Sequence, residues 1–222
     1  MNPLQKKLAA SPMLARVVPF VVFLGLTVCQ GQFGEASRYW FYLSKTIVGI
    51  WLIWSMWPLV EEMRWKFNWE AVVVGVAIFA IWVGLDGLYP KFGKAGMPWN
   101  PHLEFGENGL LAWLFVITRM VGSSVIVPPL EEVFYRSFLY RWIANPDFQS
   151  VPLGLFNWKP FLITAIVFGF SHHEWLAGIL CAFAYQGLVC WKKRLGDAMT
   201  AHAVTNFLLG SWVVWKGAWH FW

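Results

Sequence analysis

Charged residues are scarce in this sequence. Asp, Glu, Lys and Arg make up 13% of its 222 residues, against about 25% in an ordinary soluble domain. Hydrophobic residues make up 58%, and the mean hydropathy is +0.52. The 17 Trp and 6 Tyr residues are of the types that gather at the membrane–water interface. This composition disfavours a water-soluble globule and predicts an integral membrane protein.

Cysteine is also rare, and three residues cannot all pair within the chain. Cys29, Cys181 and Cys190 lie in or beside apolar stretches. They show neither a Cys-x-x-Cys spacing nor the Cys/His spacing of a metal site. We interpret them as buried apolar side chains.

Clustered positive charge is limited to one run, Lys192, Lys193 and Arg194, in a chain of net charge +5. A nucleic-acid-binding surface needs a broader basic patch, and the sequence has no second cluster. We therefore expect no nucleic-acid partner, and we place this run in a loop at an anionic lipid surface.

The sequence has no internal repeat, low-complexity tract or linker, which predicts one domain over residues 1–222. The first 30 residues have a basic start and an apolar run, as a signal peptide does, but no small-x-small cleavage site precedes Gln30. We expect this run to be the first membrane helix.

Apolar stretches of the length needed to cross a bilayer, about 20 residues, recur along the chain. Pro128 and Pro129 separate two of them, because proline cannot continue a helix but suits the first turn of the next. The predicted fold class is therefore all-α, a polytopic membrane protein of about eight helices. Positive-inside counting does not decide its orientation. The expected helices cover residues 15–29, 39–60, 71–89, 109–127, 130–144, 161–172, 175–191 and 198–215.

Two adjacent carboxylates and an arginine interrupt the fifth of these helices, in "VPPLEEVFYRSFLYRW". Ionisable residues in membrane helices indicate function by default. Glu132 and Arg136 are i and i+4 with the acid first, the favourable order for an ion pair. Glu131 projects about 100° away around the helix. We interpret Glu132 and Arg136 as a structural pair and Glu131 as free for chemistry.

Two further polar groups stand on separate apolar helices. His172 closes the sixth helix in "FGFSHHEW", where the adjacent His173 cannot point the same way. His202 and Asn206, in "AHAVTNFLLG", are i and i+4 and share a helix face. Both can donate hydrogen bonds, and two donors aimed at one point can stabilise an oxyanion. The alternative for this last pair is a polar helix–helix contact.

These residues together favour hydrolysis by an activated water molecule. Glu131 would be the base, His172 would orient the water, and His202 with Asn206 would supply the donors. The sequence offers no Ser or Cys nucleophile with a convincing base beside it.

The three motifs, Glu131-Glu132-x-x-x-Arg136, Phe168-x-x-x-His172 and His202-x-x-x-Asn206, resemble those of the CAAX-protease and bacteriocin-processing family. These are intramembrane proteases that include the Ras-converting enzyme. The motifs occur in the family's order within residues 128–210. The resemblance implies eight helices around a polar cavity, with Glu131 and His172 activating water, His202 and Asn206 forming an oxyanion hole, and Glu132 and Arg136 bracing the site.

The resemblance also implies a membrane-embedded peptide or lipidated protein as substrate. No cofactor is expected, although a zinc-dependent form using Glu131, His172 and His202 stays open, since His173 and Glu174 add polar groups nearby. A bacterial inner membrane is favoured over the endoplasmic reticulum. The chain's length and aromatic richness also suit the exosortase-associated subgroup of the family.

Two other functions remain open at this point. One is an immunity or binding membrane protein of the same fold without turnover. The other is an ion or proton transporter in which Glu131, Lys45, Asp86 and Arg119 form a relay. The transporter hypothesis lacks the repeated broken helices of many transporters. Lys45, Asp86 and Arg119 also suit an inter-helix pair or a snorkelling side chain.

Overall fold

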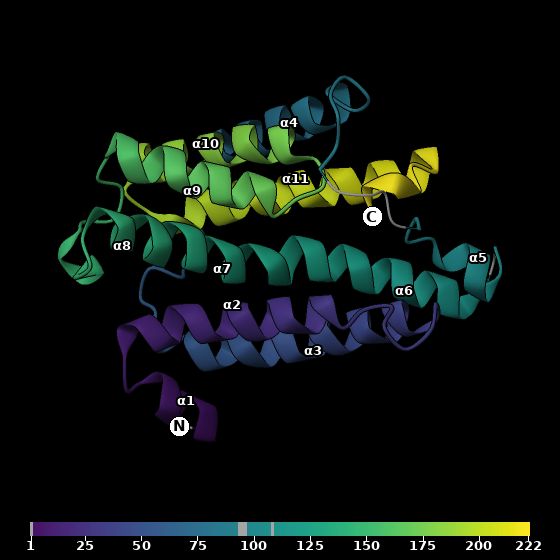
Figure 1. The fold of residues 1–222 in the computed structure, drawn as a ribbon, viewed down its shortest axis with the longest axis horizontal. Coiled ribbons are helices and arrows are strands. Elements are labelled where there is room, and N and C mark those ends of the chain that lie inside the picture. Colours follow the sequence, from purple (N-terminus) through teal and green to yellow (C-terminus); the bar gives the residue numbers. More distant parts are fainter. Residues whose placement is uncertain (1, 93–96, 108) are drawn as a thin grey trace. The chain divides into compact units, whose positions relative to one another are not determined.

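The computed structural model describes residues 2–92, 97–107 and 109–222, and all regular structure in these ranges is helical (Figure 1). The all-α prediction is therefore confirmed for this part of the chain. The α-helices are α1 (Pro3–Leu8), α2 (Pro12–Val28), α3 (Ser37–Met56), α4 (Trp69–Gly84), α5 (Pro101–Phe105), α6 (Leu110–Val121), α7 (Val127–Glu132), α8 (Tyr140–Ala144), α9 (Trp158–Phe170), α10 (Trp175–Lys192) and α11 (Leu195–Lys216).

Side-chain caps set the starts of several helices. The Ser11 hydroxyl accepts from the backbone N–H of Met13 before α2, and Asn68 accepts from Ala71 before α4. Such residues satisfy N–H groups that have no partner within the helix. At its C-terminus, α10 ends at Lys192, and the next residue, Lys193, has a left-handed φ of 56°.

Helices α6, α7 and α8 form one continuous helix, Leu110–Ala144. The prediction that the proline pair separates a fourth from a fifth helix is therefore wrong. Two π-helical segments, Gly122–Ile126 and Val133–Leu139, flank the prolines. The N–H of Val127 bonds to Gly122 O, five residues back. This wider turn gives room for proline rings that would clash in a regular α-helix.

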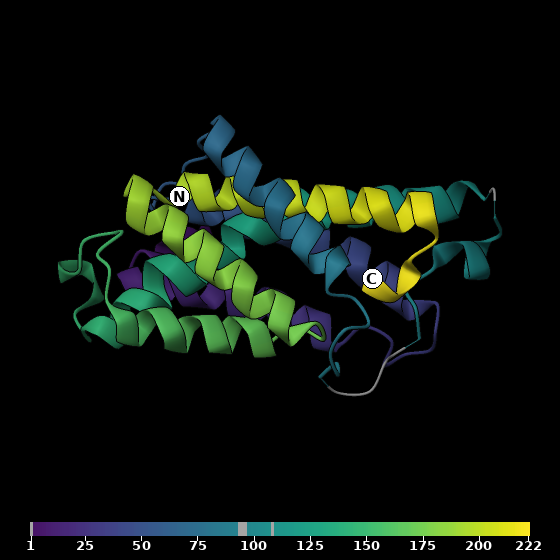
Figure 2. The same cartoon turned by 90° about the horizontal axis from the view of Figure 1, so that it is seen from above.

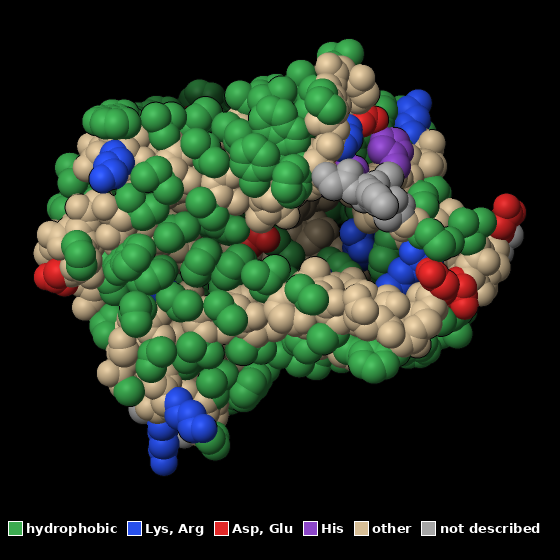
Figure 3. Space-filling model, in the orientation of Figure 1, with side chains coloured by type: hydrophobic (Ala, Val, Ile, Leu, Met, Phe, Trp, Pro, Cys, Tyr) green, Lys and Arg blue, Asp and Glu red, His purple; other side chains and the backbone are tan. Residues whose placement is uncertain are grey.

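Two of the described helices are long and apolar enough to cross a bilayer, Leu110–Ala144 and Trp175–Lys192. Shorter apolar helices are α2, α4 and α9. Hydrophobic side chains are spread widely over the face drawn in Figure 3, where charged side chains are few. Exposed large residues such as Trp191 (63%) suit contact with lipid. These features support a membrane protein, but the count of eight spanning helices is not reproduced.

The chain packs as two compact units. Unit 1 contains residues 2–61, 97–107, 109–130 and 209–222, and unit 2 contains residues 62–92 and 131–208. All six residues assigned to the site from the sequence lie in unit 2. The prediction of a single domain over residues 1–222 stays a prediction.

Within unit 2, α10 packs against α9 and α4, as Figure 2 shows. Glycines permit the close approaches. A Cβ added at Gly169 on α9 would lie 2.7 Å from the backbone O of Trp175, and one at Gly75 on α4 would lie 2.6 Å from that of Ala201 on α11. Small residues at helix crossings are typical of membrane bundles.

We expect Gly169→Val to lower the free energy of unfolding by about 1–3 kcal/mol, because the added side chain overlaps backbone atoms. Chemical unfolding in detergent micelles measures this change. Gly187→Val is the matched control, since a Cβ at Gly187 on α10 meets nothing within 4 Å. Equal stability of the two variants would contradict the tight α9–α10 contact.

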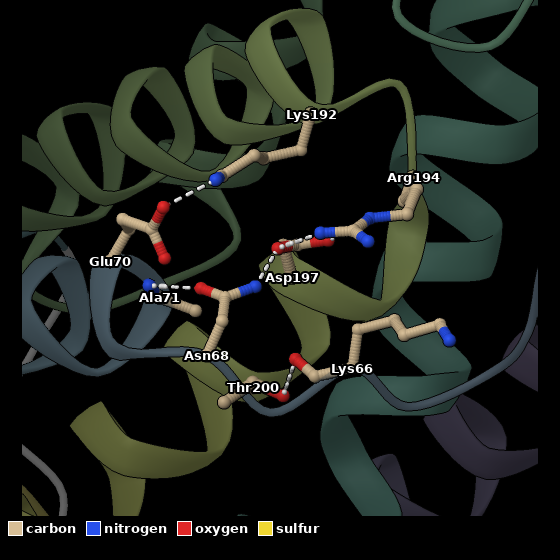
Figure 4. A network of polar contacts seen from close by, with 8 residues as sticks. All are labelled: Lys66, Asn68, Glu70, Ala71, Lys192, Arg194, Asp197 and Thr200. Carbon is tan, nitrogen blue, oxygen red and sulfur yellow. Dashed lines mark hydrogen bonds and ion pairs between the residues drawn. The ribbon is translucent and has the colours of Figure 1, made fainter.

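A polar cluster connects the segment before α4 with the turn between α10 and α11 (Figure 4). The Asn68 amide donates to Asp197, which Arg194 also contacts at 2.9 and 3.1 Å. The Thr200 hydroxyl donates to Lys66 O at 2.9 Å. The cluster holds the first turn of α11 against residues 66–68.

The basic run has internal partners, which the sequence interpretation as a lipid-facing loop did not foresee. Lys192 pairs with Glu70 at 2.5 Å, and Lys193 donates to Gly154 O at 2.6 Å. Arg194 pairs with the buried carboxylate of Asp197. These three cations therefore fix the α10–α11 turn within unit 2.

Candidate active site

The ring of Phe168 lies at the centre of the three sequence motifs. Its centroid is 4.7 Å from that of His172 and 6.2 Å from that of His202. The Arg136 guanidinium lies over its face at 4.9 Å. Phe168 and Arg136 are each 1% exposed. Three segments separated along the chain are thus gathered around one buried aromatic side chain in unit 2.

Glu132 contacts two of the proposed site residues. Its Oε2 is 3.2 Å from Arg136 Nε, which is the i,i+4 pair expected from the sequence. Its Oε1 is 2.9 Å from His202 Nδ1, a contact that sequence reasoning missed. Since Glu132 is fully buried, each partner offsets part of the cost of burying its charge. Glu132 therefore joins the first motif to the third.

The contact with Glu132 orients the His202 ring. An ionised carboxylate can only accept, so Nδ1 carries the proton and Nε2 points away from Glu132. The Tyr185 ring stacks on the imidazole, with centroids 5.2 Å apart and planes at 28°. The Tyr185 hydroxyl donates to Thr205 at 2.8 Å. Neither Tyr185 nor Thr205 was identified from the sequence.

Asn206 lies one turn after His202 on α11 and is partly buried. Four residues along a helix place two side chains on the same face. The expected arrangement of imidazole and carboxamide along one face of α11 therefore follows from the observed helix.

His172 lies just beyond α9 and not within it. The helix ends at Phe170, whereas the sequence predicted a helix to residue 172. The His172 Nδ1 is 2.8 Å from Phe168 O. A carbonyl oxygen only accepts, so Nδ1 carries the proton and Nε2 is left as an acceptor. His172 is partly buried beside Trp82, with ring centroids 5.7 Å apart.

Glu131 is partly buried on α7. Its Oε2 is buried and has no hydrogen-bond partner among the described residues. Buried polar atoms nearly always have a partner, from the protein or from ordered water. The described residues also include no direct hydrogen bond between Glu131 and His172. The Glu131 carboxylate therefore has an open acceptor position that suits a water molecule.

His173 contacts the segment after α4. Its Nδ1 is 2.6 Å from Phe92 O, and the N–H of Phe92 donates to His173 O at 3.0 Å. This paired contact gives His173 a structural role, while its neighbour Glu174 is buried at the start of α10.

A zinc site at Glu131, His172 and His202 would need the three side chains to converge on one point. The described residues contain no group of three or more His, Cys, Asp and Glu side chains close enough to hold a metal ion. Glu131, His172 and His202 are therefore not arranged as a three-ligand set here.

The charged residues suggested for a transporter relay have local partners. Asp86 pairs with Lys91 at 3.1 Å. Lys45 donates to the Thr27 hydroxyl at 3.0 Å. Arg119 lies among aromatic rings. These contacts favour a separate structural role for each residue over a shared relay.

Comparison with known protein families gives a match to the segment that carries the motifs. Residues 110–208 match the model of a family described as type II CAAX prenyl endopeptidase Rce1-like. This segment is slightly less than half of the chain and includes all three motifs. No curated protein and no solved structure matches the chain.

Proposed function

Because this chain belongs to the Rce1-like family through residues 110–208, we propose that it is an intramembrane endopeptidase. It hydrolyses a peptide bond of a membrane-anchored or lipidated substrate. The observation that carries the proposal is the convergence of the three motifs on Phe168, with the unpartnered carboxylate oxygen of Glu131 in the first motif.

The proposed reaction begins with a water molecule bound by Glu131 and His172. Glu131 takes a proton from the water, and the acceptor Nε2 of His172 orients the second water hydrogen. The oxygen then attacks the carbonyl carbon of the peptide. The resulting oxyanion accepts hydrogen bonds from His202 and Asn206. The C–N bond breaks as Glu131 returns its proton to the leaving amine.

The contact between Glu132 and His202 sets a condition on this oxyanion hole. With one proton on Nδ1, the His202 Nε2 is an acceptor and cannot stabilise an oxyanion. Nε2 becomes a donor when the Glu132–His202 pair holds one further proton. In that state the Glu132 carboxylate, 2.9 Å from Nδ1, lies beside the positive ring and compensates its charge. Glu132 thus has a role in preparing the donor as well as in pairing with Arg136.

Cleavage of a peptide library tests the proposal. Purified protein in liposomes is incubated with membrane-anchored peptides, and the products are identified by mass spectrometry. We expect cleavage by the wild type and about 10²-fold slower cleavage by Asn206→Ala, since removing one oxyanion donor costs about that much. Absence of cleavage while peptides still bind would favour the immunity or binding function. Loss of cleavage on chelation, restored by zinc, would favour the metal-dependent mechanism.

A further inference from the structure

A second polar feature lies in unit 1 and involves none of the residues of the proposed reaction. The guanidinium of Arg119, on α6, lies 4.6 Å from the ring centroid of Trp99, 4.9 Å from that of Tyr42 and 5.4 Å from that of Trp222. These rings come from α3, from the segment before α5 and from the chain end after α11. Cation–π contacts with these rings stabilise the charge of the guanidinium and use none of its N–H groups as conventional hydrogen-bond donors to oxygen.

The Arg119 side chain has no anionic partner among the described residues. It makes no ion pair and no side-chain hydrogen bond with any of them, although a guanidinium carries five N–H donors. The neighbouring cation Arg38 differs, since it pairs with Glu35 at 3.5 Å and donates to Met97 O at 3.2 Å. Arg119 is partly exposed, so a ligand can reach its donors.

The residues around Arg119 indicate the depth of its side chain in the membrane. Trp99 and Trp222 both stand on non-helical backbone, which is tolerated at membrane depth only where protein or water surrounds it. Indole rings also favour the membrane–water interface. The N–H edge of Arg119 is therefore expected at the level of the lipid headgroups, where phosphate groups are abundant.

We propose that Arg119, held by Tyr42, Trp99 and Trp222, is a binding site for phosphate, supplied by a phospholipid headgroup. The planar fork of a guanidinium matches two phosphate oxygens at once. Such a site would fasten an anionic lipid to unit 1. It is independent of peptide hydrolysis by Glu131 and His172.

Chemical protection of the wild-type protein tests this site directly. Purified protein in detergent is treated with phenylglyoxal, which modifies arginine, and the adducts at Arg119 and Arg38 are counted by mass spectrometry. We expect phosphatidylglycerol to slow modification of Arg119 about tenfold and to leave Arg38 unchanged, since a bound phosphate blocks the guanidinium edge. Inorganic phosphate forms a second arm. Protection by free phosphate alone would overturn the lipid as source, and protection by neither would overturn the phosphate site.

Variants give a second measurement. Native mass spectrometry counts retained phosphatidylglycerol in wild type, Arg119→Gln and the control Arg38→Gln, which removes the same charge from a side chain that is paired with Glu35 and bonded to Met97 O. We expect about tenfold less bound lipid only in Arg119→Gln. Retention equal to wild type would overturn the proposal. If Arg119→Gln does not fold, the protection of the wild-type protein still decides.

Discussion

Glu131→Gln is expected to slow peptide cleavage by about 10³–10⁴-fold, the upper part of the range for loss of a general base. The amide has the shape of the carboxylate but cannot take the proton of the attacking water. We expect the folding stability to stay near that of the wild type, because the buried Oε2 of Glu131 makes no hydrogen bond with the described residues. Cleavage rate and thermal unfolding of the same preparation are the two measurements.

The control for this result is Glu104→Gln, which removes an exposed carboxylate from α5. It should cleave at the wild-type rate. If Glu131→Gln retains wild-type activity while Glu104→Gln does too, Glu131 is not the base. If Glu131→Gln instead loses its folded state, its loss of activity says nothing about proton transfer, and Glu131→Asp, which keeps the carboxyl group, then distinguishes the two causes. Partial cleavage activity of Glu131→Asp would agree with Glu131 as the base. Cleavage by Glu131→Asp at the wild-type rate would contradict a base whose carboxyl group must be held in one position.

Arg136→Met should have the largest effect on stability. It leaves the fully buried carboxylate of Glu132 with His202 as its remaining partner, and breaking a buried ion pair costs about 3–5 kcal/mol. It also removes the cation–π contact with Phe168. Chemical unfolding in detergent micelles, followed by circular dichroism, measures the change in the free energy of unfolding.

The double variant Glu132→Gln/Arg136→Met provides the control for this prediction. Removing both charges together avoids an uncompensated carboxylate, so the double variant should be more stable than Arg136→Met alone. A double variant that is as unstable as the sum of the two single variants would show that the two side chains are not coupled. Since Glu132 also holds His202, the double variant should still cleave more slowly than the wild type.

The short-range pattern in the sequence predicted part of the site. The pair of Glu132 with Arg136 is observed, because residues four apart on a helix meet whatever the tertiary fold. Helices α9, α10 and α11 also begin and end within a few residues of the expected positions. These features depend on local periodicity and on hydrophobic runs.

The contacts that assemble the site depend on tertiary packing and could not be predicted. Glu132 and His202 are 70 residues apart in the sequence. No local spacing indicates that one would hydrogen-bond to the other. The stacking of Tyr185 on His202 has the same origin. A tyrosine inside an apolar helix gives no signal that separates it from an ordinary core residue.

The proline pair misled the prediction for a different reason. Proline breaks an α-helix because it lacks an N–H and clashes with the carbonyl four residues back. In this chain the preceding turn is π-helical, and the N–H of Val127 bonds five residues back to Gly122. The helix therefore continues through Pro128 and Pro129 as one element of 35 residues. Glu131 consequently lies in the interior of a long helix and not in the first turn of a new one.

The contact between Asn68 and Asp197 has a consequence for the position of α11 along its own axis. Asp197 lies in the first turn of α11 and is held by a residue that also caps α4. His202 and Asn206 follow five and nine residues later, about 7 and 13 Å along the axis. A helix that slid by one residue would carry both donors about 1.5 Å away from an oxyanion. The short segment 66–68, remote in sequence from every proposed catalytic residue, thus sets the axial position of the proposed oxyanion donors within unit 2.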